Sequence, residues 1–247
     1  MRILKQTTTA IISLVLVLMF LLAVSANATA AKNNELTEKT THKKKQTIRT
    51  TWTDADRAIM KAADEKLAID MPAPGLTAGN KAPNFKLTNA FGKTIELKQE
   101  LAKGPVVLIF YRGAWCPYCN LHLQALKSQQ TEFAKYDAQV IAISPQLPDK
   151  SAEQVKKEGF PFEVLSDTSA MVMKDYKLYF ELPADLMTVY KEHGLDIEDF
   201  NGEGRNGLPT PGAFVIDKNG IIRTMQAEVD YKTRMSSEDI ILALAKL

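Results

Sequence analysis

The stretch VVLIFYRGAWCPYCNLHLQAL, residues 106–126, sets the fold and carries both cysteines of this 247-residue chain, Cys116 and Cys119. It opens with an unbroken apolar run, Val106–Tyr111, which is typical of a strand buried on both faces. A short turn, RGAW, follows, and a helix is predicted from Cys116 to Tyr136. The strand, the turn and the helix therefore bring two thiols to one helix end, in a chain that has no other cysteine.

The proline between the cysteines indicates where the helix starts. Pro117 directly follows Cys116, and proline is favoured at the first helical position because its missing N–H would have no partner there. Cys116 is then the N-cap residue and Cys119 the third helical residue. Free backbone N–H groups and the helix dipole stabilise a thiolate at this end, and the spacing allows a disulfide. The pair is predicted to be a redox-active dithiol, with Cys116 the more acidic and exposed thiol.

Other roles for the two thiols have weaker support. A structural disulfide would close a very short loop and constrain the unfolded chain little. A metal site built from Cys116, Cys119 and His122 lacks a fourth ligand at a usual spacing, and His122 is interpreted as a helix-surface residue. Covalent haem attachment needs a histidine directly after the second cysteine, where Asn120 stands. Two inert buried thiols fit poorly with a helix start, and neither a metal nor another cofactor is predicted.

Beyond this stretch, strands and helices alternate along the chain. The predicted strands are Phe85–Leu87, Thr94–Leu97, Val106–Tyr111, Val140–Ser144, Phe162–Leu165, Ala213–Ile216 and Ile221–Gln226. Further helices are predicted at 53–68, 149–159 and 237–246. The last two strands are joined by the turn DKNG and form a hairpin. This order predicts an α/β fold, in which helices flank both faces of a central mixed β-sheet.

The first 30 residues have the pattern of a secretory signal peptide. Two positive charges in Met1–Lys5 precede the apolar run Ile11–Val24, and small-x-small triplets at 26–28 and 28–30 offer cleavage sites. The run is short for a membrane span, and an uncleaved N-terminal anchor is the alternative. The predicted organisation is a signal peptide at 1–28, a polar linker plus a short helix at 29–75, and one α/β domain at 76–247. Export to a periplasmic or extracellular compartment follows from this pattern.

The charge balance argues against nucleic acid as a partner. The formal net charge is +2, and removal of the signal peptide takes away Arg2 and Lys5 but no acid, so the mature chain is close to neutral. Nucleic-acid-binding domains favour clustered basic charge. The one basic run, His42–Lys45, lies in a polar, Thr-rich stretch and is interpreted as a solvated linker.

Four segments show a family resemblance: GNKAPNFKL at 79–87, FYRGAWCPYC at 110–119, VIAISPQ at 140–146 and TPGAFVIDKNGIIR at 210–223. From about Leu76 to the C-terminus, the chain resembles the alkyl hydroperoxide reductase/thiol-specific antioxidant family, a peroxiredoxin-like branch of the thioredoxin fold. The resemblance implies reduction of hydroperoxides by a cysteine that becomes a sulfenic acid and then forms a disulfide. It also implies that a thioredoxin-like donor reduces this disulfide.

The active-site segment departs from the family pattern Pro-x-x-x-Thr-x-x-Cys. Arg112 takes the place of the proline, Cys116 that of the threonine, and Cys119 that of the peroxide-attacking cysteine. The alignment therefore makes Cys119 the nucleophile, in contrast to the prediction from the helix start. The arginine that the family places before the late strand is replaced by Pro211, as in thioredoxin.

Several side chains are expected to support the cysteine pair. Arg112 either supplies positive charge to the thiolate or is a solvent-facing turn residue, and Trp115 is expected to pack over the nucleophile. Thr210 and Pro211 precede an apolar strand, where a proline indicates an edge strand or a cis peptide bond. The thioredoxin resemblance implies that a cis-proline there faces the cysteines and shapes the substrate groove. The predicted site comprises the catalytic Cys116 and Cys119, with Arg112, Trp115, Pro117, Thr210 and Pro211 as groove or thiolate-supporting residues.

Three functions remain open at this point. The favoured one is an exported, thioredoxin-dependent thiol peroxidase that acts on hydroperoxides through a CxxC disulfide. The second is an exported thiol–disulfide oxidoreductase that acts on protein disulfides, and the third is a module that binds a soft metal such as copper(I). An oxidising compartment keeps dithiols oxidised, so the first two require a thioredoxin-like electron donor or a membrane thiol reductant. No membrane contact is predicted beyond an uncleaved N-terminal anchor.

Overall fold

The structure is a computed structural model that describes residues 52–247, of which Ala55–Leu247 form one compact unit. The predicted signal peptide and the polar stretch up to residue 51 lie outside the described residues. The helix predicted at 53–68 is present as α2 (Asp54–Asp70), and it lies upstream of the domain start predicted at residue 76. Within the described part of the chain, no helix is both long and apolar enough to span a membrane.

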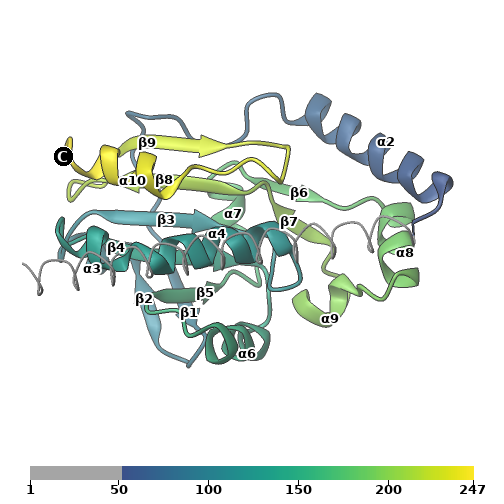
Figure 1. Ribbon diagram of the computed structural model, residues 1–247, viewed down its shortest axis with the longest axis horizontal. Coiled ribbons are helices and arrows are strands. Elements are labelled where there is room, and N and C mark those ends of the chain that lie inside the picture. The colour runs from purple at the N-terminus through teal and green to yellow at the C-terminus, as the bar shows by residue number, and fades with distance from the viewer. Residues whose placement is uncertain (1–51) are drawn as a thin grey trace, which may run out of the picture. The chain divides into compact units, whose positions relative to one another are not determined.

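A mixed sheet of seven strands forms the centre of this unit (Figure 1). Its strands, in spatial order, are β2 (Thr94–Glu96), β1 (Lys86–Asn89), β5 (Glu163–Ser166), β4 (Gln139–Ser144), β3 (Val106–Phe110), β8 (Gly212–Ile216) and β9 (Ile222–Ala227). Strands β3, β4 and β5 run parallel to one another, and β8 pairs antiparallel with both β3 and β9. Two short strands, β6 (Tyr179–Glu181) and β7 (Gly207–Pro209), pair separately. The predicted α/β fold with a mixed sheet is confirmed.

Strand β3 shows why the sheet must be covered on both faces. All five of its residues are buried, and successive side chains of a strand point to opposite faces. Val107 and Ile109 pack into one hydrophobic cluster, whereas Leu108 and Phe110 pack into another. The first cluster also contains the two cysteines. The apolar run that predicted a buried strand therefore supplies both cores, one of which lies directly behind the thiols.

Helices cover the two faces unequally. The helices after α2 are α3 (Leu97–Leu101), α4 (Pro117–Ser128), α5 (Gln130–Ala134), α6 (Pro148–Glu158), α7 (Met171–Asp175), α8 (Ala184–Glu192), α9 (Ile197–Asn201) and α10 (Ser237–Leu244). Buried residues of α4, α5, α6 and α10 belong to the cluster with the cysteines, and those of α3 and α7 to the opposite cluster. Figure 1 shows α4 lying along the sheet in front of β3 and β4.

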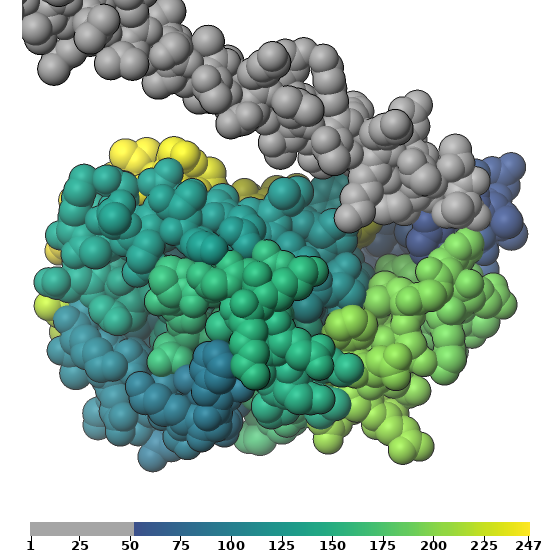
Figure 2. Space-filling view, turned by 60° about the horizontal axis from the view of Figure 1, so that its bottom comes forward, coloured from purple at the N-terminus to yellow at the C-terminus, as the bar shows by residue number. Residues whose placement is uncertain are grey.

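One predicted helix needs correction. The single helix predicted from Cys116 to Tyr136 is divided into α4 and α5, because the chain leaves helical geometry at Gln129. The Gln129 N–H bonds the Leu126 carbonyl, which tightens the turn and lets Phe133 enter the core. The Met- and Tyr-rich segment 171–190 forms α7, β6 and most of α8, the last of which starts directly after Pro183. Figure 2 shows the α8–α9 segment, in yellow-green, beside the green segment around α6.

The packing of β3 predicts a large effect of truncation in its centre. Leu108 is fully buried between Ile141 of β4 and Phe214 of β8. Leu108→Ala is expected to lower the free energy of unfolding by about 2–5 kcal/mol, because it leaves a cavity that the neighbours only partly fill. Urea unfolding of the purified protein measures this. Leu242→Ala, on the exposed side of α10, is the matched control and should change stability by less than about 0.5 kcal/mol. Equal effects of the two substitutions would contradict this packing.

Candidate active site

The turn between β3 and α4 places the cysteine pair where the sequence predicts it. Cys116 is the N-cap of α4, with extended backbone angles (φ −85°, ψ 112°), and Pro117 is the first helical residue. Both cysteines are free thiols, and their Sγ atoms lie 2.8 Å apart. A disulfide has a sulfur–sulfur distance of about 2.05 Å, so the bond can form with a small movement.

The expected difference in exposure between the two thiols is wrong, because each cysteine is only 1% exposed. Their chemistry also differs from the prediction made from the helix start. Burial alone would raise the pKa of Cys119, but the hydrogen bond between the two thiols, the Arg234 guanidinium and the Arg112 backbone together lower it. The same hydrogen bond, together with burial, raises the pKa of Cys116. These directions make Cys119 the more readily ionised thiol of the pair, in agreement with the family alignment.

Arg112 is a buried part of this site and not a solvent-facing turn residue. It is 5% exposed, and its positive charge lies close enough to both cysteines to favour their ionised forms. The guanidinium carbon lies 4.9 Å from the ring centre of Trp115 and 4.5 Å from that of Tyr231. Nη2 donates a long hydrogen bond of 3.4 Å to the Tyr190 hydroxyl. Stacking on aromatic faces is a favourable environment for a desolvated guanidinium.

Trp115 packs against the cluster that contains the cysteines, as expected. Its position depends on Gly113, where a Cβ atom would collide with the indole and where φ is +154°. The indole Nε1 has no hydrogen-bond partner among the described residues. A glycine at this point of the turn is therefore required for the tryptophan to reach the cysteine pair.

Arg234 is a site residue that the sequence analysis missed. Its Nη2 lies 3.5 Å from Cys119 Sγ, although the two residues are 115 positions apart. Arg234 lies in residues 228–236, the loop between β9 and α10, called the β9–α10 loop below. Met235 of this loop packs in the same cluster as the cysteines, and the ring centre of Tyr231 lies 5.7 Å from that of Tyr118. The loop thus covers the start of α4, and no local spacing in the sequence indicates this.

His122 is buried, at 9% exposure, and the interpretation as a helix-surface residue is wrong. Burial, with the nearby Arg234 charge, lowers its pKa to about 4, so the imidazole is neutral at pH 7. The backbone of Met235, next to Arg234, acts in the opposite direction and favours the charged imidazole. Among the described residues, no group of three or more His, Cys, Asp or Glu side chains could hold a metal ion. The structure thus assigns His122 to packing and to contact with the loop.

A buried polar network holds the turn before Cys116. The Ala114 N–H donates to Gln146 Oε1 at 2.7 Å, and Asn120 Nδ2 donates to the Ala114 carbonyl at 2.6 Å. Gln154 of α6 donates to Asn120 Oδ1 at 2.9 Å and accepts from the Tyr111 hydroxyl at 2.8 Å. The turn is therefore tied to β3, α4, α6 and the loop after β4. Gln146 lies in the VIAISPQ segment, which carries the family resemblance but had no predicted role.

Thr210 and Pro211 lie where the chain passes from β7 into β8. Their peptide bond is trans, and β8 is a central strand, so neither the cis bond nor the edge strand expected from the proline is present. The reason is local: pairing with β3 starts at Gly212, so the missing N–H of Pro211 falls outside the ladder. Thr210 is fully buried, and its N–H donates to the Leu178 carbonyl at 2.7 Å.

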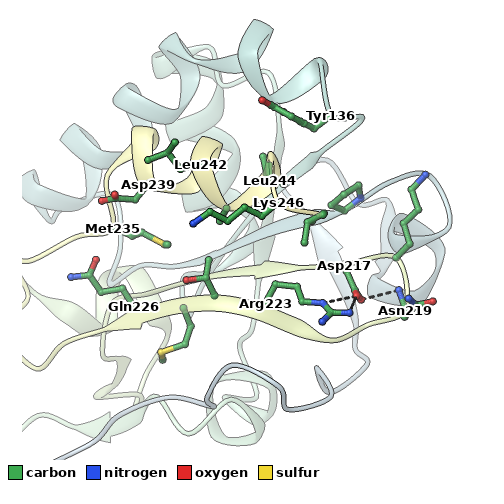
Figure 3. A pocket seen from close by; sticks show the side chains of 16 residues that line it. Tyr136, Asp217, Asn219, Arg223, Gln226, Met235, Asp239, Leu242, Leu244 and Lys246 are labelled. Carbon is green, nitrogen blue, oxygen red and sulfur yellow. Dashed lines mark hydrogen bonds and ion pairs between the residues drawn. The ribbon is translucent and has the colours of Figure 1, made fainter.

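Two hollows on the molecule differ in their relation to this site. A cavity of about 460 Å³ is lined by Arg112, Pro211 and Tyr231 together with residues of α2, β6 and α8. A larger groove of about 1130 Å³ lies between β9 and α10 (Figure 3). Its walls include Arg223, which pairs with Asp217, and Met235, but neither cysteine. The smaller cavity is therefore the one that adjoins the active site, because Arg112 belongs to both.

The contact between Arg234 and Cys119 predicts that Arg234 makes the cysteine pair more acidic. Arg234→Gln removes a positive charge from the thiolate, so the first ionisation of the reduced pair should move to higher pH and the thiolate fraction at neutral pH should fall several-fold. The ultraviolet absorbance of the thiolate, followed against pH, measures this. Arg223→Gln, which removes an arginine paired with Asp217 away from the cysteines, is the control and should leave the titration unchanged. An unchanged titration in Arg234→Gln would show that this contact does not support the thiolate.

Comparison with known proteins identifies the family. The family model described as "AhpC/TSA family" matches residues 78–225. Chloroplastic peroxiredoxin Q of Oryza sativa subsp. japonica is 30% identical over 148 residues, which cover 60% of this chain and 58% of that protein. The corresponding protein of Populus jackii is 29% identical over 145 residues, which cover 59% of this chain and 57% of that protein. The chain thus spans just under three-fifths of the length of these relatives.

Solved structures agree on the fold. Peroxidoxin BcpB from Mycobacterium tuberculosis has a TM-score of 0.56 at 21% identity, covering 70% of this chain and 98% of that one. Reduced Prx3 from Vibrio vulnificus, in complex with hydrogen peroxide, has a TM-score of 0.55 at 20% identity, covering 68% of this chain and 99% of that one. The family match includes β3, the cysteine turn and β8. This chain therefore belongs to the AhpC/TSA family, with a thioredoxin-like fold.

Proposed function

We propose that this protein is a thiol peroxidase that reduces hydroperoxides with Cys119 and resolves the product with Cys116. One observation carries the proposal: the Cys119 sulfur, whose pKa is lowered, lies 3.5 Å from the Arg234 guanidinium and 2.8 Å from the Cys116 sulfur. A nucleophile, a nearby cation and a second thiol in contact are the groups that such a reaction needs. Membership in the AhpC/TSA family supports the same reaction.

The proposed reaction has two steps at these atoms. The Cys119 thiolate attacks the outer oxygen of the hydroperoxide, the O–O bond breaks, and the alkoxide leaves as an alcohol after taking a proton. Cys119 is then a sulfenic acid. The Cys116 thiol attacks this sulfur, an S–S bond forms, and water leaves. The hydroperoxide has gained two electrons, and a reduced dithiol of the thioredoxin type returns them by thiol–disulfide exchange.

Charge and proton supply at the site fit these steps. Arg112 and Arg234 together place positive charge beside the sulfur and the leaving oxygen, where negative charge develops. The raised pKa of Cys116 keeps this thiol protonated while Cys119 is ionised. A protonated Cys116 stabilises the thiolate through its hydrogen bond and supplies a proton when the disulfide forms.

The oxidoreductase alternative is supported by the WCxxC sequence and by Pro211, which lies on the same cavity as Arg112. Burial of both sulfurs favours the peroxidase instead. Each cysteine is 1% exposed beneath the β9–α10 loop, so a protein disulfide could reach the sulfurs only after this loop moves. A small hydroperoxide needs a much smaller opening.

The two cysteines should lose activity in different ways. Cys119→Ser should consume no hydroperoxide above background. Cys116→Ser should consume about one equivalent, stop as a sulfenic acid that a diketone reagent traps, and show no turnover because no resolving thiol is present. The assay titrates hydrogen peroxide and an organic hydroperoxide while a thioredoxin system oxidises NADPH. Catalytic turnover by both variants would rule out these roles for Cys119 and Cys116. If the unaltered protein reduces insulin but does not turn over peroxide, the oxidoreductase function is favoured.

We also propose that the protein is exported, with a thioredoxin-like donor or a membrane thiol reductant supplying electrons in that compartment. The charged start, the apolar run and the triplets at 26–30 support this. N-terminal sequencing of the protein from fractionated cells should find a start near residue 29 in the exported fraction. A start at Met1 in a membrane fraction would indicate an uncleaved anchor, and a start at Met1 in the cytoplasmic fraction would contradict export.

A further inference from the structure

A cavity outside the sulfur pair is built in part by a helix that the family match does not include. The family model starts at residue 78, whereas α2 ends at Asp70. Helix α2 and the segment of β6 and α8 both line the cavity of about 460 Å³, and α2 lies next to α8 in Figures 1 and 2. This volume is in the range of small-molecule sites, about 300–1,000 Å³. Neither cysteine lines the cavity.

The walls of this cavity are mainly apolar. Its apolar lining includes Leu67 of α2, Met71 just after it, Leu186 of α8 and Val229 of the β9–α10 loop. Leu67 and Met71 are only half-buried, and Asp56 is the one fully buried residue of α2. The apolar side of α2 is therefore incompletely covered by the protein itself. An apolar molecule in the cavity would complete this packing.

Arg112 gives the cavity one buried positive charge. It is 5% exposed, its Nε has no hydrogen-bond partner, and no carboxylate among the described residues lies within ion-pair distance of its guanidinium. Asp64, on the same cavity wall, interacts with Arg112 through charge, although no ion pair joins the two side chains. The Cys119 thiolate interacts with both Arg112 and Arg234. Since no carboxylate is bonded to the guanidinium, the buried Nε of Arg112 is left for an acceptor on a bound molecule.

The acidic residues on the cavity wall lie nearer to solvent. Asp64, Asp70 and Glu181 are all exposed. Asp70 is paired with Lys66 at 2.5 Å, and Glu181 accepts a hydrogen bond from the Tyr179 hydroxyl at 2.8 Å. Exposed charges are screened by water, whereas a buried charge acts through a lower dielectric constant. Arg112 is therefore expected to decide the sign of the head group that binds.

We propose that this cavity binds an amphipathic monocarboxylate, with its carboxylate on the Arg112 guanidinium and its apolar chain between α2 and α8. Arginine and carboxylate form strong, paired hydrogen bonds where both are desolvated. Such a ligand occupies a site beside the sulfurs and is not the hydroperoxide consumed in the reaction.

Binding at Arg112 also couples the ligand to the thiol pair. The charge of Arg112 favours the ionised forms of both cysteines, so a carboxylate that neutralises it should move the first ionisation of the pair to higher pH. By reciprocity, loss of the thiolate should strengthen ligand binding. The disulfide form, which carries no thiolate, is therefore expected to bind the carboxylate more tightly than the reduced form at neutral pH.

The test compares three probes with the same ten-carbon chain, below their micelle concentrations: decanoate, decanol and decyltrimethylammonium. Calorimetry on the full chain in its disulfide form measures binding without peroxide or reductant, so the result does not depend on peroxidase activity. Decanoate is expected to bind at least about ten-fold more tightly than decanol, because a hydrogen bond to a charged group contributes an affinity gain of this order. Tightest binding of the ammonium probe, or equal binding of all three, would overturn the proposal.

Variants locate the site. Arg112→Gln should remove the preference for decanoate over decanol. Leu67→Asp should weaken decanoate binding at least ten-fold, because it places a carboxylate in the apolar wall. This loss of affinity is roughly what the loss of one buried apolar side-chain contact would cause. Ile69→Asp is the matched control on the same helix; Ile69 is 78% exposed and does not line the cavity, so binding should be unchanged. Unchanged decanoate binding in Leu67→Asp would show that the ligand binds elsewhere. The three-probe comparison uses the unaltered protein, so it tests the proposal even where a variant does not fold.

Discussion

Burial of a negative charge at Cys119 is the constraint on which the rest of the site depends. A thiolate removed from water is strongly unfavourable unless hydrogen bonds and opposite charges compensate for the lost hydration. Here the compensation comes from the Cys116 thiol, the Arg112 backbone and the guanidinium of Arg234. Each of these groups must then be held in place by other parts of the chain.

The surrounding structure provides this support from three directions. Strand β3 and the hydrogen bonds of Gln146 and Asn120 hold the turn that carries Arg112 and Cys116. The rings of Trp115 and Tyr231 hold the Arg112 side chain. The β9–α10 loop carries Arg234 to the start of α4. The site is therefore held by hydrogen bonds on the side of the sheet, and the loop is the element whose movement would expose the sulfurs.

The family motif alone does not determine which cysteine is ionised. Position at a helix start favours Cys116, because the N-cap is closest to the free N–H groups. The structure reverses this order, since both cysteines are equally buried and Arg234 contacts Cys119. A charge contact within one site thus outweighs the weaker effect of the helix dipole. The same contact accounts for the agreement between the structure and the family alignment.

Much of the fold and the centre of the site could be predicted from the sequence. The apolar run Val106–Tyr111 identified the central strand, and Pro117 identified the helix start, because both signals depend on neighbouring residues. The break at Gln129 and the burial of His122 could not be predicted, since both depend on what α4 and α5 pack against.

The sequence by itself determined that two thiols lie at one helix end behind a buried strand, because backbone conformation there is set by residues within a few positions. Only the tertiary structure decided the properties of these thiols. Arg234 reaches Cys119 across 115 positions, and α2 encloses a cavity beside Arg112 although it precedes the family match. Such contacts join distant segments through packing of the whole domain. Electrostatic interactions depend on distance and burial in space, and neither can be read from the order of residues along the chain.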